Sequence, residues 1–194
     1  MGLTCVEHSK IGLLGTMLFL GWMASSMIVP GLSDIYGRKK FFIGFHVLQV
    51  AAIFGLLWCS NVKQALALLF ALGFSGVGRS PIVYIYLLEM LTPQYQKVIG
   101  PIFASSVGIC LAGGTFLLQM MTKDAVWCFY ASLILSVFAM FFSVFFIPES
   151  PKYLHATGQF DECRKVLSYM AVCNGEDSEK MANVRFTQEP IAQP

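Results

Sequence analysis

The stretch AVWCFYASLILSVFAMFFSVFFIP, residues 125–148, contains 24 residues without a charged side chain. A helix that crosses the hydrocarbon core of a membrane needs about 20 mostly apolar residues. Similar charge-free stretches occupy residues 11–33, 41–62 and 98–122, and another apolar stretch, residues 64–88, is interrupted only by Arg79. All are too long and too uniformly apolar for the ~10-residue alternating strands of a membrane barrel. We therefore predict an all-α, polytopic membrane helical bundle with five transmembrane helices, at about residues 11–33, 41–60, 65–89, 98–121 and 125–148.

The composition of the whole chain agrees with a membrane protein. Of the 194 residues, 56% are hydrophobic and 12% are charged, whereas soluble domains carry about 25% charged residues. Residues 11–147 contain ten charged side chains, but residues 149–194 contain twelve. These values exclude a soluble globular domain and a disordered chain. The net charge of +2, with no basic run beyond residues 38–40, gives no reason to expect a nucleic-acid partner.

The distribution of lysine and arginine predicts the orientation in the membrane. Five spans place the two termini on opposite sides, and cytoplasmic loops carry the excess of Lys and Arg. One side has seven such residues near the spans, and the other has three: Arg38, Lys39, Lys40, Lys97, Lys152, Arg164 and Lys165 against Lys10, Lys63 and Lys123. We expect the N-terminus outside or in a lumen, the C-terminus in the cytoplasm, and no cleavable signal peptide.

No pattern in the sequence is typical of catalysis or of metal binding. Three cysteines lie in or beside spans, two follow the last span, and one lies near the N-terminus, so they form no disulfide framework: Cys59, Cys110, Cys128, Cys163, Cys173 and Cys5. There is no metal-ligand spacing, and His46 and His155 are isolated. Without paired intramembrane carboxylates or a nucleophile beside a base, we predict no enzyme, no cofactor and no metal.

The third span contains the irregular stretch GFSGVGRSP, residues 73–81, with a charge near the middle of the membrane. An arginine at that depth costs about 2.5–3.5 kcal/mol on insertion scales. We interpret Arg79 as a cavity residue that attracts negative charge; the alternative is an arginine satisfied by backbone carbonyls and water. Tyr84, Tyr86 and Gln119 are further cavity candidates, although two tyrosines separated by two positions cannot share a helix face.

Small residues recur at helical spacing in two spans. Gly12, Gly15, Gly21 and Ser25 lie in the first span, and Ala104, Gly108 and Ala112 lie in the fourth. Such stripes let helix backbones approach closely in lipid. They indicate either packing within the chain or a surface for a second membrane chain. The aromatic residues of the second and fifth spans favour positions that face lipid.

Three polar segments at the ends of spans are more specific than composition. They are GLSDIYGRKK at residues 31–40, EMLTPQYQK at residues 89–97 and PESPKYL at residues 148–154. Together they resemble the N-terminal half of a major facilitator superfamily transporter, over about residues 3–175. The resemblance implies that the five spans correspond to helices two to six of that fold. The stretches at residues 3–5, 97–100 and 174–175 resemble the organic cation/anion/zwitterion branch, whereas Pro93 is more similar to sugar porters.

The resemblance also implies a charge network that closes a cytoplasmic gate. Its members would be the residues of the three segments: Asp34, Gly37, Arg38, Lys39, Glu89, Lys97, Glu149 and Lys152. Exposed ion pairs contribute only ~0–1 kcal/mol each, so the lock would have to be the whole network. The sequence departs from the family pattern at Pro30, Ile35, Leu69 and Lys97. We interpret Lys40 as a determinant of topology only.

We predict three parts of the chain. Residues 1–148 form the transmembrane domain, residues 149–175 form a cytoplasmic linker helix, and residues 176–194 form a disordered tail. Apolar residues in the linker recur at helical spacing, which is typical of a short amphipathic helix: Phe160, Cys163, Val166, Leu167 and Met170.

These features together predict transmembrane transport of a small organic solute, an organic ion, by alternating access. By the resemblance, the chain is an incomplete transporter that lacks the first helix, a large lumenal loop and the second half of the fold. Its expected partners are a small-molecule solute, the lipid bilayer, and another membrane chain or the missing C-terminal half. The alternatives are a non-transporting accessory subunit or degenerate half-transporter, and a sugar porter.

Overall fold

The computed structural model describes residues 8–120, 125–177, 184 and 186. These residues form seven helices and no strand: α1 (His8–Tyr36), α2 (Arg38–Trp58), α3 (Val62–Met90), α4 (Pro93–Met120), α5 (Ala125–Phe146), α6 (Pro151–Ala156) and α7 (Phe160–Cys173). The first five are long and apolar enough to cross a membrane. The predicted all-α bundle with five candidate membrane spans is confirmed.

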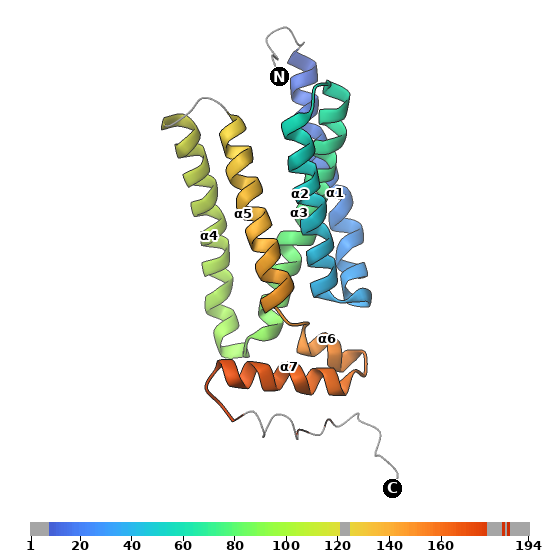
Figure 1. The fold of residues 1–194 in the computed structure, drawn as a ribbon, viewed down its shortest axis with the longest axis vertical. Helices are drawn as coiled ribbons and strands as arrows, with labels where there is room; N and C mark the ends of the chain where they lie inside the picture. The colour runs from blue at the N-terminus through green and yellow to red at the C-terminus, as the bar shows by residue number, and fades with distance from the viewer. Residues whose placement is uncertain (1–7, 121–124, 178–183, 185, 187–194) are drawn as a thin grey trace.

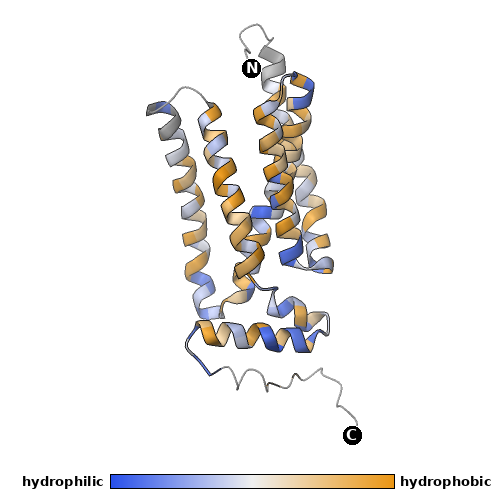
Figure 2. Ribbon diagram, in the orientation of Figure 1, coloured by the Kyte–Doolittle hydropathy of each residue, from blue (hydrophilic) through white to orange (hydrophobic). Residues whose placement is uncertain are grey.

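The five long helices run along the long axis of the molecule, and the two short ones lie across one end (Figure 1). Helices α1, α2 and α3 form one group, while α5 connects to that group mainly through α2 and α4 lies at the outer edge. Hydrophobic residues cover much of α1–α5, whereas α7 presents a mixed surface with many hydrophilic residues (Figure 2). The polar residues of the linker therefore gather at one end of an apolar bundle.

Helices α1 and α3 pack with their backbones in direct contact. A Cβ atom added at Gly21 would lie 2.8 Å from the backbone nitrogen of Phe74, and one at Gly73 would lie 2.8 Å from the carbonyl carbon of Leu18. Gly21 therefore marks a helix contact within the chain, as its small size predicts. Gly12 and Gly15, by contrast, have no atom within 4 Å of the added Cβ.

The helices extend beyond the predicted spans into the polar turns. The turn expected at residues 34–40 is reduced to Gly37, whose φ is +102°, so that Asp34 lies in the last turn of α1. Helix α4 begins at Pro93 rather than near residue 98, because the first helical position needs no backbone N–H. Helix α3 continues through residues 73–81 as one helix with Pro81 inside it.

The linker forms two helices where we predicted one. Ser150 caps α6, and its Oγ accepts a hydrogen bond from the backbone nitrogen of Tyr153 at 3.4 Å. The turn after α6 contains Gly158 with φ +74°, and α7 follows. Leu154 of α6 is buried against Cys163 and Val166 of α7. The predicted amphipathic helix is α7, and most of the tail at residues 176–194 lies outside the described residues.

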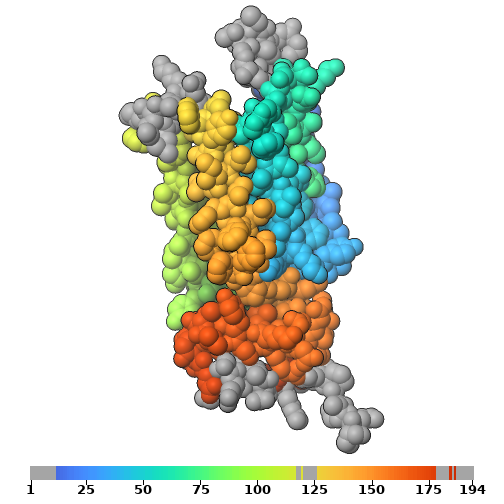
Figure 3. Space-filling model, in the orientation of Figure 1, coloured from blue at the N-terminus to red at the C-terminus, as the bar shows by residue number. Residues whose placement is uncertain are grey.

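Figure 3 shows that α6 and α7 form a continuous layer of atoms beneath the ends of the long helices. The linker is therefore packed against the bundle rather than extended away from it.

Candidate functional site

A cluster of charged side chains lies next to the linker, where α1 and α3 end and α2 begins. Arg38 is its centre, because its Nη2 lies 3.0 Å from Oδ1 of Asp34 and its Nε lies 2.9 Å from Oε2 of Glu89. The side chains of Arg38 and Glu89 are each 14% exposed, whereas that of Asp34 is 63% exposed. Since water screens an exposed pair, the Arg38–Glu89 pair is the stronger of the two.

Glu149 joins this cluster to the linker. Its Oε1 accepts hydrogen bonds from the backbone nitrogens of Lys39, at 3.0 Å, and Ser150, at 3.1 Å. The Oγ of Ser150 donates to Oε2 of Glu89 at 2.6 Å. We call these residues together the gate network, after the role that the family resemblance implies for most of them: Asp34, Arg38, Lys39, Glu89, Glu149 and Ser150. It links α1, α2 and α3 to the start of α6.

Two tyrosines reinforce the same junction. Tyr153 of α6 donates from its hydroxyl to the backbone oxygen of Ile35 at 3.0 Å, and Tyr86 of α3 donates to that of Pro148 at 2.7 Å. Neither contact was predicted, and nor was the Ser150 contact. For Ser150 the signal was available, since a serine before proline is typical of a helix N-cap followed by the first helical position.

Gly37 is required by the close approach of the linker to the α1–α2 turn. A Cβ atom there would lie 2.9 Å from Oε2 of Glu149 and 3.2 Å from Cε1 of Tyr153, on a backbone with positive φ. The neighbouring Lys39 extends to α5, where its Nζ donates to the backbone oxygen of Val144 at 3.2 Å. A cation is favourable at the C-terminal end of a helix, where carbonyls are unpaired.

Two of the predicted gate residues lie apart from the network. Lys97 and Lys152 are exposed, and neither makes an ion pair with any described carboxylate. Six of the eight predicted residues are therefore brought together: Asp34, Gly37, Arg38, Lys39, Glu89 and Glu149.

Arg79 lines a cavity of about 320 Å³ between α1, α2, α3 and α5. The other lining residues are Leu18, Trp22, Gln49, Ile53, Leu72, Gly73, Gly76, Phe129 and Ser132. Within the described part of the chain, Arg79 makes no ion pair, because the carboxylates of the long helices, Asp34 and Glu89, belong to the gate network. The cavity thus contains a cation without a counter-charge from these residues.

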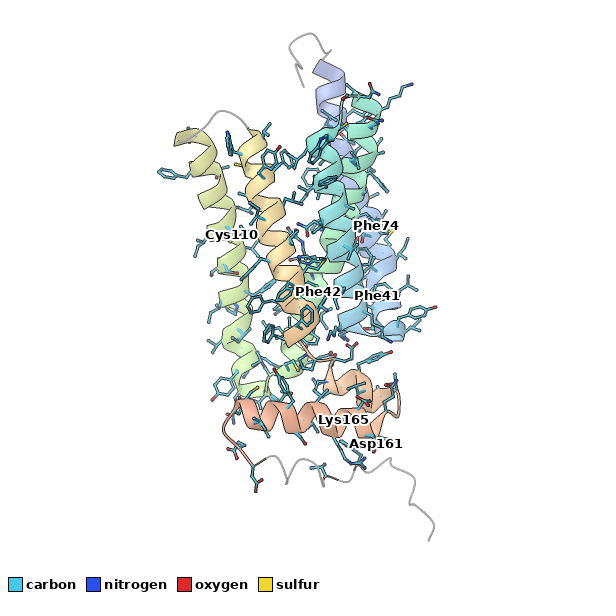
Figure 4. All side chains as sticks on the ribbon, in the orientation of Figure 1. Phe41, Phe42, Phe74, Cys110, Asp161 and Lys165 are labelled. Atoms are coloured by element: carbon cyan, nitrogen blue, oxygen red, sulfur yellow. The ribbon has the colours of Figure 1, made fainter. Side chains whose placement is uncertain are left out.

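Polar side chains buried between α2 and α5 lie beside this cavity. Nε2 of Gln49 donates to Oγ of Ser136 at 3.2 Å, while Oε1 of Gln49 is buried without a partner among the described residues. The two ring nitrogens of His46 are likewise buried and unpartnered there. Figure 4 shows the side chains between these helices, with Phe42 labelled on the α5 side of α2.

The other predicted cavity residues do not line the Arg79 cavity. Tyr84 faces α4, where its ring lies 5.4 Å from that of Phe103. Tyr86 shares a helix face with Arg79 but is seven residues further on, about 10 Å along the axis, and contacts Pro148. Gln119 is exposed near the end of α4. Neither tyrosine therefore lines the cavity with Arg79.

No group of three His, Cys, Asp or Glu side chains that could hold a metal ion occurs among the described residues. The five cysteines that the structure describes are not in disulfides.

Comparison with known proteins gives a consistent result. The family model described as "Sugar (and other) transporter" matches residues 4–189. Synaptic vesicle glycoprotein 2B of Rattus norvegicus is 31% identical over 180 residues, which cover 84% of this chain and 26% of that protein. The putative metabolite transport protein YncC of Bacillus subtilis (strain 168) is 29% identical, over 93% of this chain and 39% of that protein. Organic cation/carnitine transporter 4 of Arabidopsis thaliana is 27% identical, over 90% of this chain and 33% of that protein. The chain spans less than half the length of each of these relatives.

Proposed function

The chain belongs to the sugar (and other) transporter family of the major facilitator superfamily, and from that membership we propose that it contributes half of a carrier for a small organic ion. It is an integral, multi-pass membrane protein, and its family is one of transporters rather than enzymes. The finer proposal is that the solute carries negative charge and that the chain works by alternating access, in which two halves rock around a site near the middle of the membrane.

The observation that carries this proposal is the unpaired Arg79 in the cavity between α1, α2, α3 and α5. A cation in the membrane interior needs an acceptor, and one without a carboxylate partner attracts an anionic ligand. The neighbouring lining is largely apolar and aromatic, including Trp22 and Phe129, which suits the organic part of such a solute. A neutral sugar would not compensate the charge of Arg79.

We propose that the gate network locks one end of this path. Arg38 bridges α1 and α3, and Glu149 connects the first turn of α2 to the linker. We propose that this end faces the cytoplasm, as the distribution of lysine and arginine predicts. We also propose that the contacts of the network break when the carrier opens to the cytoplasmic side instead of the opposite one. Because Glu89 is held by both Arg38 and Ser150, the contacts of Glu89 are the strongest part of the lock.

The test is uptake into cells that express the full chain, with radiolabelled organic anions, organic cations and sugars as separate panels. We expect uptake of an organic anion that Arg79→Gln abolishes and Arg79→Lys retains in part. Lys63→Gln is the matched control, since Lys63 lies at the far end of α3 and does not line the cavity. Uptake that persists in Arg79→Gln, or uptake of sugars alone, would contradict the proposal.

A second candidate function is an accessory membrane subunit, and the exposed face of α4 favours it. Added Cβ atoms at Gly108, Gly113 and Gly114 would meet nothing within 4 Å. A stripe of small residues in lipid is typical of a surface that receives another helix. No uptake of any solute, together with a membrane protein that co-purifies stoichiometrically and is lost in Gly108→Phe, would favour this second function.

A further inference from the structure

An apolar groove lies on the side of α2 that faces away from α5. Its volume is about 560 Å³, and it is lined by Tyr36 of α1, by Phe74 of α3, and by one face of α2: Lys40, Phe41, Gly44, Phe45 and Leu48. In Figure 4, the labels of Phe41 and Phe74 lie on the α1 side of α2, opposite Phe42. An added Cβ atom at Gly44 would meet nothing within 4 Å, so the missing side chain helps to open the groove.

Lys40 provides a charge at the rim of this groove. It is the last of three consecutive cations, and the first two are engaged with the protein: Arg38 pairs with Asp34 and Glu89, and Lys39 donates to Val144. Lys40 is exposed and makes no hydrogen bond or ion pair within the described residues. Its ammonium group is therefore available to a ligand from outside the chain, which a role in topology alone does not require.

The groove covers most of the length of an acyl chain in one leaflet. From Lys40 to Leu48 the helix rises about 12 Å, and half of a ~30 Å hydrocarbon core is about 15 Å. The charged end of the groove lies beside the gate network, at the end of the bundle where charged residues gather, and the apolar end points toward the middle of the bundle. This polarity matches a phospholipid, with a charged headgroup at the membrane surface and an acyl chain below it.

We propose that this groove is a binding site for one anionic phospholipid, with its phosphate at Lys40 and an acyl chain along Gly44 and Leu48 over Phe74. Charge complementarity selects a lipid with net negative charge, since the rim contributes a cation and no described carboxylate pairs with it. A second helix is disfavoured as the occupant, because four aromatic rings line this groove and Gly44 is its one small residue, so it offers no stripe of small residues for close helix contact. The site is separate from the Arg79 cavity and does not depend on which solute is carried.

The test is native mass spectrometry of the purified full chain in detergent, titrated with phosphatidylglycerol or with phosphatidylcholine. We expect one phosphatidylglycerol to bind about five-fold more tightly than phosphatidylcholine, the factor for about 1 kcal/mol from one lysine near anionic lipid. Lys40→Gln should remove this preference, and Lys40→Arg should keep it. Lys63→Gln, an exposed lysine at the other end of the bundle, is the control and should have no effect.

Gly44→Leu tests the apolar part of the site, because an added Cβ atom there meets nothing within 4 Å and the rest of the side chain would extend into the groove. We expect this variant to bind one lipid fewer of either kind and to keep the melting temperature of the parent. Equal binding of the two lipids, or a preference that survives Lys40→Gln, would overturn the proposal. So would a Gly44→Leu variant that changes its oligomeric mass but binds lipid as before, since a protein would then occupy the groove.

Discussion

The contact between α1 and α3 makes Gly73→Ala the most decisive substitution for the fold. The added methyl group would overlap the backbone oxygen of Leu18 and lie 3.1 Å from its Cα. Backbone atoms cannot move aside by rotating a side chain, so the two helices would have to separate. The same crossing contains Gly21 against the backbone of Phe70 and Phe74, and this contact would loosen as well.

The size of the effect follows from two opposing contributions. Overpacking costs about 1–3 kcal/mol, and a backbone clash belongs at the upper end of that range. Alanine in place of glycine in a helix recovers about 1 kcal/mol, which leaves a net loss of about 2 kcal/mol. The control is Gly108→Ala in α4, where nothing lies within 4 Å of the added Cβ atom. There, only the gain of about 1 kcal/mol in the free energy of unfolding remains.

The two variants should therefore differ by about 3 kcal/mol in the free energy of unfolding. For a chain of this size, that difference corresponds to roughly 6–12 °C in melting temperature. Thermal unfolding of the purified full chain in detergent, followed by circular dichroism, measures it directly. A Gly73→Ala variant that melts at or above the temperature of Gly108→Ala would refute the direct backbone contact.

Three further predictions concern other parts of the molecule. Glu89→Gln removes the less exposed partner of Arg38 and should lower the free energy of unfolding by about 1.5–3 kcal/mol. Asp34→Asn changes the exposed partner of Arg38 and should lower it by less than about 1 kcal/mol. Equal losses of stability in thermal unfolding would contradict this order. Ser136→Ala leaves Nε2 of Gln49 without its acceptor and should lower the free energy of unfolding by about 0.6 kcal/mol. Adding Gln49→Leu should recover stability, because both polar partners are then gone. A double variant that melts at a lower temperature than Ser136→Ala alone would contradict this expectation. Burial raises the pKa of the Cys163 thiol, so a smaller fraction of it is thiolate at pH 8. Iodoacetamide should therefore modify the buried Cys163 more slowly than the exposed Cys173. Equal rates of modification at the two cysteines, measured by peptide mass spectrometry, would contradict this prediction.

The five membrane helices could be predicted because stretches of about 20 residues without charge have few other structures available to them. Their ends could not be predicted as well, since hydropathy falls where polar residues begin, but the helical hydrogen bonds continue. Asp34 illustrates this: the chain remains helical through Tyr36, and the backbone nitrogen of Gly37 still donates to the oxygen of Ser33 at 3.2 Å.

The members of the gate network could be named only through the family resemblance. Arg38 and Glu89 are 51 positions apart, and nothing local in either segment shows that their side chains meet. The contacts of Tyr86 and Tyr153 with backbone oxygens were missed for the same reason, because a backbone acceptor leaves no mark in the sequence. Arg79, in contrast, could be singled out by its cost in the membrane alone.

The split of the linker into α6 and α7 differs from the single predicted helix, although its signals are present in the sequence. Ser150 and Pro151 begin one helix, and Gly158 ends its last turn with a positive φ. The amphipathic spacing that begins at Phe160 predicts α7 but not the shorter helix before it.

The most direct test of the central proposal is whether the Arg79 cavity is wet and selects negative charge. Ser132 lines this cavity, so Ser132→Cys places a thiol in the cavity that Arg79 also lines. The variant is made in the full chain with its native cysteines replaced by serine and is reconstituted in liposomes. We predict that anionic methanethiosulfonate ethylsulfonate modifies it several-fold faster than the cationic trimethylammonium analogue, and that Arg79→Gln removes the difference. No reaction with either reagent, or a ratio of rates that Arg79→Gln leaves unchanged, would contradict an anion-selective cavity.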